Sequence, residues 1–305
     1  MGGDTPTVSV IVATYQRSQV LRLALASILN QDFKDYEVWV VGDGCTDDSE
    51  QVTAAFGDPR VKWVNLPKNM GSQAFANNEG IERARGRYIA FLGHDDLWMP
   101  WHLSSLVAFI EEKEADVVHP LVALIGPEGT RESVGPPKPN VPLRRHWFPP
   151  SSWLLRRSIV DATGKWSDPA TIPDAVDWNY LKRMHDAGAR LLFLPSLSVL
   201  KFPSPWFRNA YHNIGTPIQQ KYWEQIETDA DGLKEQLLLE LSIVTAMSTR
   251  GGDEPVLSAL SHAVRVLLRR VVDLGGRERG LSAPLMFWRI KRRTRKIRRF
   301  KGLSP

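Results

Sequence analysis

Short apolar segments rich in β-branched residues recur through the first hundred residues, and this recurrence constrains the fold most strongly. They cover residues 8–13, 36–41, 61–64 and 88–92. Segments of this length and composition are typical of buried strands, and the stretches between them show helical periodicity. Strands that alternate with helices form βαβ units, so the sequence predicts an α/β fold. We expect a Rossmann-like, mostly parallel twisted sheet flanked by helices.

Polar residues follow three of these strands at the point where each strand ends. The segments are Ala13-Thr14-Tyr15-Gln16-Arg17, Gly42-Asp43-Gly44-Cys45-Thr46-Asp47 and Gly93-His94-Asp95-Asp96. The carboxyl ends of neighbouring parallel strands meet at one edge of the sheet, where open α/β sheets bind their ligands. We therefore expect the three segments to converge on one crevice.

The side chains in this predicted crevice suit a nucleotide diphosphate. Asp43 can accept a hydrogen bond from a base N–H or a ribose hydroxyl, and Tyr15 can stack on a base. Asp96 can hold Mg²⁺ or Mn²⁺ on a pyrophosphate, because these hard cations prefer oxygen ligands. The pair Asp95–Asp96 has a second interpretation, in which it caps the helix that follows.

Composition and charge narrow the class of protein. The chain has 305 residues and one cysteine, Cys45, which excludes an internal disulfide framework and fits a reducing compartment. We find no signal-like segment and no uninterrupted run of eighteen apolar residues, so we expect a cytoplasmic protein. Residues 289–301 hold nine Lys and Arg and no acid, which leaves the rest of the chain net acidic. An acidic body argues against nucleic-acid binding.

The second half of the chain adds further predicted elements. They are a helix over 103–113, a strand over 116–125, a Pro- and Gly-rich loop or domain junction over 126–150, a helix over 176–187, strands over 191–194 and 197–201, and helices from 217 onward. Residues 284–301 combine basic residues with an apolar strip at helical spacing. Such a helix binds anionic membrane surfaces. The alternatives are a solvated tail or one that binds nucleic acid or a partner subunit.

Five motifs occur in a characteristic order. They are Val8–Arg17 with its Val-Ser-Val-Ile opening, Ile28-Leu-Asn-Gln31, Gly42–Asp47, Asn69-Met-Gly71 with Ala76-Asn-Asn-Glu-Gly80, and Ala84–Asp96. Over about residues 6–203 the chain resembles the inverting family 2 glycosyltransferases of GT-A fold. The resemblance implies a nucleotide-sugar-binding half over 1–125, an acceptor-binding half over 126–205 and a helical C-terminal extension over 206–305.

The resemblance also implies roles for the residues at the strand ends. Asp43 takes the base-contacting position, Asp95 contacts the ribose or donor sugar, and Asp96 binds Mn²⁺ or Mg²⁺. His94 stands where the family often has Asp, so it is either a second metal-site residue or a structural turn residue. The donor set is completed by Ala13, Thr14, Tyr15, Arg17, Asn69 and Gly71. Gly42 replaces the first Asp of the family's turn, which removes one expected contact.

The resemblance places a general base at Asp177, which opens a predicted helix after Val176, where the family often has Glu. Asp174 competes for that role, and Asp177 could alternatively cap the helix. The predicted reaction moves a sugar, from a UDP-sugar by preference, to a glycan or lipid-linked acceptor hydroxyl in surface-glycan or glycoconjugate synthesis. A homodimer is a further expectation. The rival classes are a non-catalytic nucleotide-sugar-binding subunit and a nucleotidyltransferase.

Overall fold

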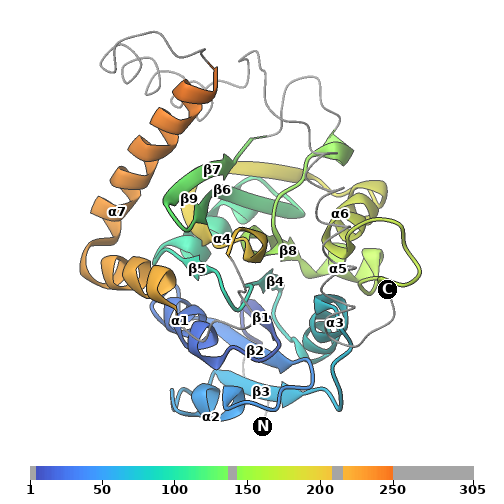
Figure 1. The fold of residues 1–305 in the computed structure, drawn as a ribbon. Helices are drawn as coiled ribbons and strands as arrows, with labels where there is room; N and C mark the ends of the chain where they lie inside the picture. The colour runs from blue at the N-terminus through green and yellow to red at the C-terminus, as the bar shows by residue number, and fades with distance from the viewer. Residues whose placement is uncertain (1–4, 137–142, 208–215, 250–305) are drawn as a thin grey trace.

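The computed structural model describes residues 5–136, 143–207 and 216–249 (Figure 1). Strands in these ranges are β1 Val8–Thr14, β2 Tyr36–Gly42, β3 Val61–Asn65, β4 Tyr88–Phe91, β5 Leu97–Trp98, β6 Val117–Gly126, β7 Gly129–Val134, β8 Leu154–Arg156 and β9 Leu191–Lys201. Helices are α1 Ser18–Leu29, α2 Ser49–Ala54, α3 Gln73–Arg83, α4 His102–Glu112, α5 Arg157–Thr163, α6 Val176–Asp186 and α7 Pro217–Thr249. Short 3₁₀ turns cover Leu143–Arg145, Pro150–Ser152 and Ser204–Trp206.

The strands of the described residues form one mixed sheet in the order β3-β2-β1-β4-β8-β6-β9-β5, with β7 paired to β6. Strands β1 to β4 are parallel to one another where they pair, as the sequence predicts. Strand β8 is antiparallel to both β4 and β6, and β9 is parallel to β6. The chain direction reverses from β4 to β8 and again from β8 to β6, so β6 and β9 run in the same direction as β4. Strand β9 therefore ends at the same edge of the sheet as β1, β2 and β4.

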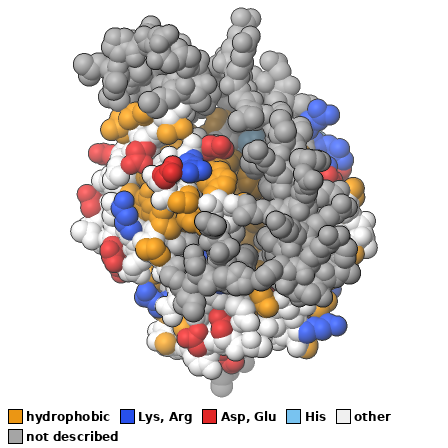
Figure 2. All heavy atoms as spheres, viewed as in Figure 1, with side chains coloured by type: hydrophobic (Ala, Val, Ile, Leu, Met, Phe, Trp, Pro, Cys, Tyr) orange, Lys and Arg blue, Asp and Glu red, His pale blue; other side chains and the backbone are white. Residues whose placement is uncertain are grey.

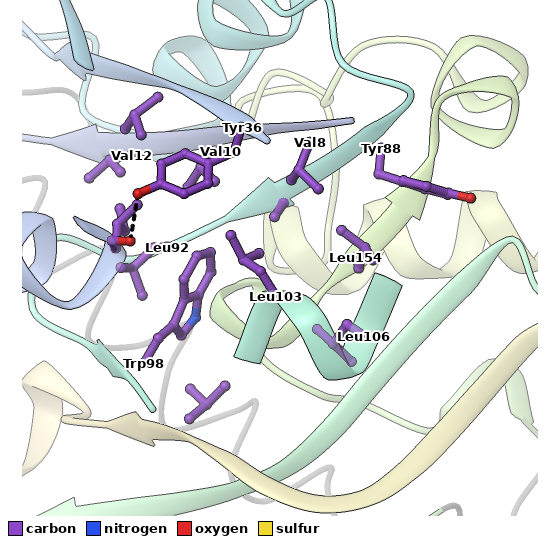
Figure 3. Close-up of a cluster of buried hydrophobic side chains, with 14 of the residues drawn as sticks. Val8, Val10, Val12, Tyr36, Tyr88, Leu92, Trp98, Leu103, Leu106 and Leu154 are labelled. Atoms are coloured by element: carbon purple, nitrogen blue, oxygen red, sulfur yellow. Dashed lines mark hydrogen bonds between the residues drawn. The ribbon is translucent and has the colours of Figure 1, made fainter. Parts of the chain in front are cut away.

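The two faces of the sheet are covered by different helices, which explains why the strands are apolar on both sides. Val8, Val10 and Val12 pack with α1 and α4 in one buried cluster, shown in Figure 3. The hydroxyl of Tyr36 donates a hydrogen bond of 3.0 Å to the carbonyl of Ile28 in this cluster (Figure 3). This bond satisfies a buried polar group and ties β2 to the end of α1.

The opposite face of the sheet is covered by α3, α5 and α6 (Figure 1). Its cluster contains three mutually contacting aromatic rings: the centroid of Trp166 lies 5.6 Å from that of Trp153 and 4.7 Å from that of Tyr180, and the last two are 6.3 Å apart. Phe91 at the end of β4 contacts Trp166 edge-on at 5.4 Å. These rings anchor the end of β4, after which Asp95 and Asp96 follow, to α6, the helix that carries Asp177.

Two predicted features differ from the structure. Part of the segment 126–150 is ordered as β7, which extends the sheet as a hairpin with β6. The two strands predicted over 191–194 and 197–201 are one strand, β9, whose register against β6 shifts around Pro120 and Leu121. Proline cannot donate to a ladder, so Pro120 and Pro195 interrupt the pairing locally without ending the strand.

A helix begins at Pro217, as predicted; this helix, α7, is bent at Asp229, where the backbone leaves helical geometry. Residues of α7, including Tyr222, Trp223 and Leu237, pack against β5, β6 and β9 in a third cluster.

The predicted tail segment 284–301 lies outside the described residues. No helix in the described ranges is long and apolar enough to cross a membrane. On the face in Figure 2, acidic and basic side chains of the described residues are interspersed.

Candidate active site

Asp43 organises the ends of β1 and β2. Its backbone N–H donates to the carbonyl of Thr14 at 2.7 Å, and its side chain is only 5% exposed. Its two carboxylate oxygens accept hydrogen bonds from the amides of Met70 at 2.7 Å and Gly71 at 3.1 Å. Asn69 also accepts from the Gly71 amide, at 2.7 Å. The structure therefore brings the predicted residues Asp43, Asn69 and Gly71 together at the edge of the sheet.

The loop after β1 is fixed against the loop after β2 by a residue that sequence reasoning missed. The side-chain oxygen of Gln16 accepts hydrogen bonds from the amides of Thr46 and Asp47 at 3.1 and 3.0 Å. Gln16 and Arg17 both have left-handed backbone geometry, at φ 52° and 67°. Such geometry costs about 1–3 kcal/mol for each non-glycine residue, so the bonds that hold this loop must offset it. Ala13 and Thr14 lie in β1, and half-buried Tyr15 follows.

The departure at Gly42 has a steric explanation. A Cβ atom at this position would lie 2.5 Å from the Asn65 side-chain oxygen and 2.9 Å from the Trp63 ring. Asn65 in turn accepts from the amide of Cys45 and donates to its carbonyl, both at 2.9 Å. The space that an acidic side chain would need is thus filled by groups that shape the turn.

Asp95 is held as a carboxylate at the carboxyl end of β4. One oxygen accepts hydrogen bonds from Arg17 Nη1 at 3.1 Å and from the Ser204 hydroxyl at 2.8 Å. Burial opposes ionisation, but the charges of His94, Arg17 and Lys201 outweigh it and lower the pKa of Asp95 to about 2. His94 is buried, and its Nε2 lies 3.4 Å from Arg17 Nη1.

Asp96 is fully buried and is paired with a lysine 105 residues further along the chain. Its Oδ2 accepts from the Ser151 hydroxyl at 2.5 Å and from Lys201 Nζ at 2.8 Å, and its Oδ1 accepts from the Phe202 amide at 3.0 Å. Burial raises the pKa of Asp96, Lys201 lowers it, and Asp95 raises it, with a net rise. Burial lowers the pKa of Lys201, but the charges of Asp96 and Asp95 raise it by more than burial lowers it. The net effect is a raised pKa, so the lysine stays protonated.

Asp96 and His94, as arranged, leave little room for a divalent cation. A carboxylate has about four lone-pair positions, and three of those on Asp96 already accept protein hydrogen bonds, one of them from an ammonium. The Nε2 of His94 faces the Arg17 guanidinium. In the described part of the chain, no group of three or more His, Cys, Asp or Glu side chains could hold a metal ion. The predicted metal-binding roles of Asp96 and His94 stay predictions.

The structure separates the two candidates for the general base. Asp177 accepts hydrogen bonds from Trp147 Nε1 at 3.0 Å and from the Trp178 amide at 2.8 Å. Burial raises the pKa of Asp177. The hydrogen bond from Trp147 and the charge of Lys201 lower this pKa, but by less than burial raises it. Asp174 instead forms an ion pair with Lys182 at 2.7 Å. The charge of Lys201 thus lowers the pKa of Asp177, whereas the carboxylate of Asp174 is engaged by Lys182.

The capping interpretation of Asp177 is wrong, because Ala175 is the N-cap residue of α6 and Asp177 lies inside the first turn. A carboxylate there still interacts favourably with the helix dipole.

Three further site residues were missed in the sequence: Ser151, Lys201 and Ser204. Lys201 had a usable signal, because it ends a predicted strand, as the acidic residues do. Ser151 and Ser204 had none, because each lies in an irregular segment near prolines.

A mixed, largely parallel sheet with carboxylates gathered at its strand ends defines a ligand-binding α/β domain. Residues 9–160 match the family model of Glycosyl transferase family 2. The chain thus contains a family 2 glycosyltransferase domain of GT-A fold.

A curated relative is the GalNAc(5)-diNAcBac-PP-undecaprenol beta-1,3-glucosyltransferase of Campylobacter jejuni, 37% identical over 115 residues, which covers 37% of this chain and 37% of the relative. The chain's matches to these curated relatives span between 17% and 50% of their lengths.

Solved structures share the fold at low sequence identity. S. aureus TarS in complex with UDP-GlcNAc aligns with a TM-score of 0.58 at 20% identity, over 87% of this chain and 81% of that chain. The mannosyltransferase PcManGT of Pyrobaculum calidifontis, in complex with GDP-Man and Mn²⁺, aligns with a TM-score of 0.52 at 17% identity, over 95% and 85%. These likenesses support the predicted fold class.

Proposed function

We propose that this chain transfers a sugar from a nucleotide-diphosphate sugar, preferably a UDP-sugar, to an acceptor hydroxyl with inversion at the anomeric carbon. The observation that carries the proposal is the convergence of Asp43, Asp95, Asp96 and Asp177 with Lys201 at one edge of the sheet. The strand-end position of Asp43, Asp95, Asp96 and Lys201 is where open α/β sheets bind nucleotides. Asp177 lies in the first turn of α6, where the charge of Lys201 acts on it. The UDP-GlcNAc and GDP-Man found in the structural neighbours agree with a nucleotide-sugar donor.

In this proposal each carboxylate has its own task. Asp43 accepts from the base or ribose of the donor, next to the Asn69–Gly71 turn. Asp177 removes the proton from the acceptor hydroxyl, and its raised pKa improves its match to a proton that leaves near neutral pH. A single in-line displacement by the acceptor oxygen inverts the anomeric centre.

The acceptor side of the proposal is a glycan or lipid-linked sugar in surface-glycan or glycoconjugate synthesis. The undecaprenol-linked acceptor in the name of the Campylobacter relative supports it. The basic segment 284–301, with its apolar strip, would hold the enzyme at the inner face of an anionic membrane beside such an acceptor. Residues 1–125 would serve the donor, 126–205 the acceptor, and 206–305 the attachment.

The proposal is tested by incubating the full chain with a panel of nucleotide sugars and following release of nucleotide diphosphate by chromatography. Proton NMR of the product then gives the anomeric configuration. We expect turnover of at least one UDP-sugar and an inverted product. Tight binding without any turnover would support the non-catalytic subunit instead. Release of pyrophosphate from a nucleoside triphosphate and a sugar phosphate would support nucleotidyl transfer.

A further inference from the structure

Lys201 occupies the centre of the acidic site. It is the last residue of β9, and its ammonium lies 2.8 Å from Asp96. Its charge also acts on Asp95 and Asp177, so one cation interacts with the acid pair and with the candidate base. The Lys201 side chain is 21% exposed, whereas Asp96 has no exposed surface. Lys201 is therefore the member of this ion pair that a ligand can reach.

The ammonium has hydrogen-bonding capacity beyond its contact with Asp96. A lysine carries three N–H donors, and among the described residues Lys201 donates one hydrogen bond, to Asp96. The two other donors can point toward the partly open side of the group. Asp96, fixed by Ser151 and the Phe202 amide, sets the position of the lysine without being accessible itself.

The departing group of sugar transfer needs a cation at this place. When the bond between the anomeric carbon and the diphosphate breaks, negative charge accumulates on the diphosphate oxygens. Preorganised donors and cations aimed at developing charge commonly make the largest contribution to catalysis. Three of the roughly four lone-pair positions of Asp96 are already occupied, and one of the three is taken by the Lys201 ammonium, which places a cation there.

We propose that Lys201 is a catalytic residue that binds the donor diphosphate and stabilises it as it leaves, taking the electrostatic task that a divalent cation would otherwise perform. This inference rests on the proposed sugar transfer. The acceptor oxygen forms a bond to the anomeric carbon while the bond to the diphosphate oxygen breaks. The acceptor proton goes to Asp177, and the electron pair leaves with the diphosphate. Lys201 donates hydrogen bonds throughout and transfers no proton.

The test compares the wild type with Lys201→Met and Lys201→Arg in buffer that has been treated with a chelator. Two quantities are measured: the dissociation constants of UDP and GDP by calorimetry, and the rate of nucleotide diphosphate release from the nucleotide sugar that is turned over. The matched control is Lys62→Met, since Lys62 pairs at 2.7 Å with Glu37, which is 4% exposed, near the starts of β3 and β2, at the opposite edge of the sheet from the site.

We expect the wild type to bind UDP or GDP and to release product without metal. Lys201→Met should weaken the diphosphate complex about 10-fold or more and lower the rate by about 10²–10³-fold, as for loss of one donor to developing charge. Lys201→Arg should keep part of the nucleotide affinity and part of the release rate. Lys62→Met should keep the affinity and the rate of the wild type. Thermal unfolding identifies any loss of folding, and the double variant Lys201→Met/Asp96→Asn avoids a buried unpaired carboxylate.

The inference is overturned if neither nucleotide binds the wild type in chelator. It is also overturned if Mn²⁺ is needed for binding and release while Lys201→Met matches the wild type in its presence. Failure of the proposed function looks different, because then no nucleotide sugar is turned over with or without Mn²⁺. In that case the chelator binding data for wild type and Lys201→Met still decide whether Lys201 binds a diphosphate.

Discussion

Replacing Trp147 by Phe isolates one hydrogen bond to the candidate base. The indole N–H donates to Asp177 at 3.0 Å and stabilises its charged form. Hydrogen bonds to charged groups contribute about 1.5–3 kcal/mol, and one pKa unit corresponds to about 1.4 kcal/mol. Loss of this bond should therefore raise the pKa of Asp177 by about 1–2 units above its already raised value.

The sign of the effect on rate follows from the role of a base. A base must be ionised, so activity falls as the pH drops through the pKa of Asp177. In Trp147→Phe the acidic limb of kcat/KM for the acceptor should move to higher pH by about 1–2 units. Well above the shifted pKa, the difference from the wild type should narrow.

The assay is product formation across pH 4–9 at saturating donor, a range of about five units that brackets the limb. Trp101→Phe is the matched control, since its indole N–H donates to the carbonyl of Leu197 at 3.0 Å and contacts none of the acidic residues described above. We expect the control to leave the limb in place. The assignment of Asp177 as the general base would be refuted if the acidic limb of kcat/KM did not move in Trp147→Phe. It would also be refuted if the limb moved equally in the Trp101→Phe control.

Three further outcomes follow from the same site. Asp177→Asn should lower kcat by about 10²–10⁴-fold with little change in the KM for donor, while Asp174→Asn stays near wild type; the reverse pattern in steady-state kinetics would make Asp174 the base. Asp43→Asn removes charge from the carboxylate that holds the Met70 and Gly71 amides, so it should lower the free energy of unfolding by about 1–3 kcal/mol in urea titrations and raise the KM for donor. Removal of residues 284–305 should abolish sedimentation with anionic liposomes but keep activity on a short soluble acceptor, and full-length protein that stays in solution at low salt would contradict the membrane role.

Local patterns determined the first half of the fold. The alternation of buried strands and amphipathic helices over residues 8–92 depends on side-chain periodicity, which each segment carries in its own sequence. The positions of Asp43, Asp95 and Asp96 followed from the same reasoning, since a residue after a parallel strand must lie at the ligand-binding edge. The bend of α7, the hairpin β6–β7 and the continuous strand β9 were less visible, because prolines and long-range pairing decide them.

The tertiary structure alone decided what surrounds each acid. Strand β8 reverses the sheet twice, and that is why Lys201 arrives beside Asp96, 105 residues earlier in the chain. Trp147 reaches Asp177 from the loop before β8, and Ser151 reaches Asp96 from the adjoining 3₁₀ turn. Sequence spacing identifies chemical groups at strand ends, but their charge states depend on neighbours that only chain folding supplies. Ion pairing thus holds Asp95 and Lys201 charged against the effect of burial, whereas burial raises the pKa of Asp177.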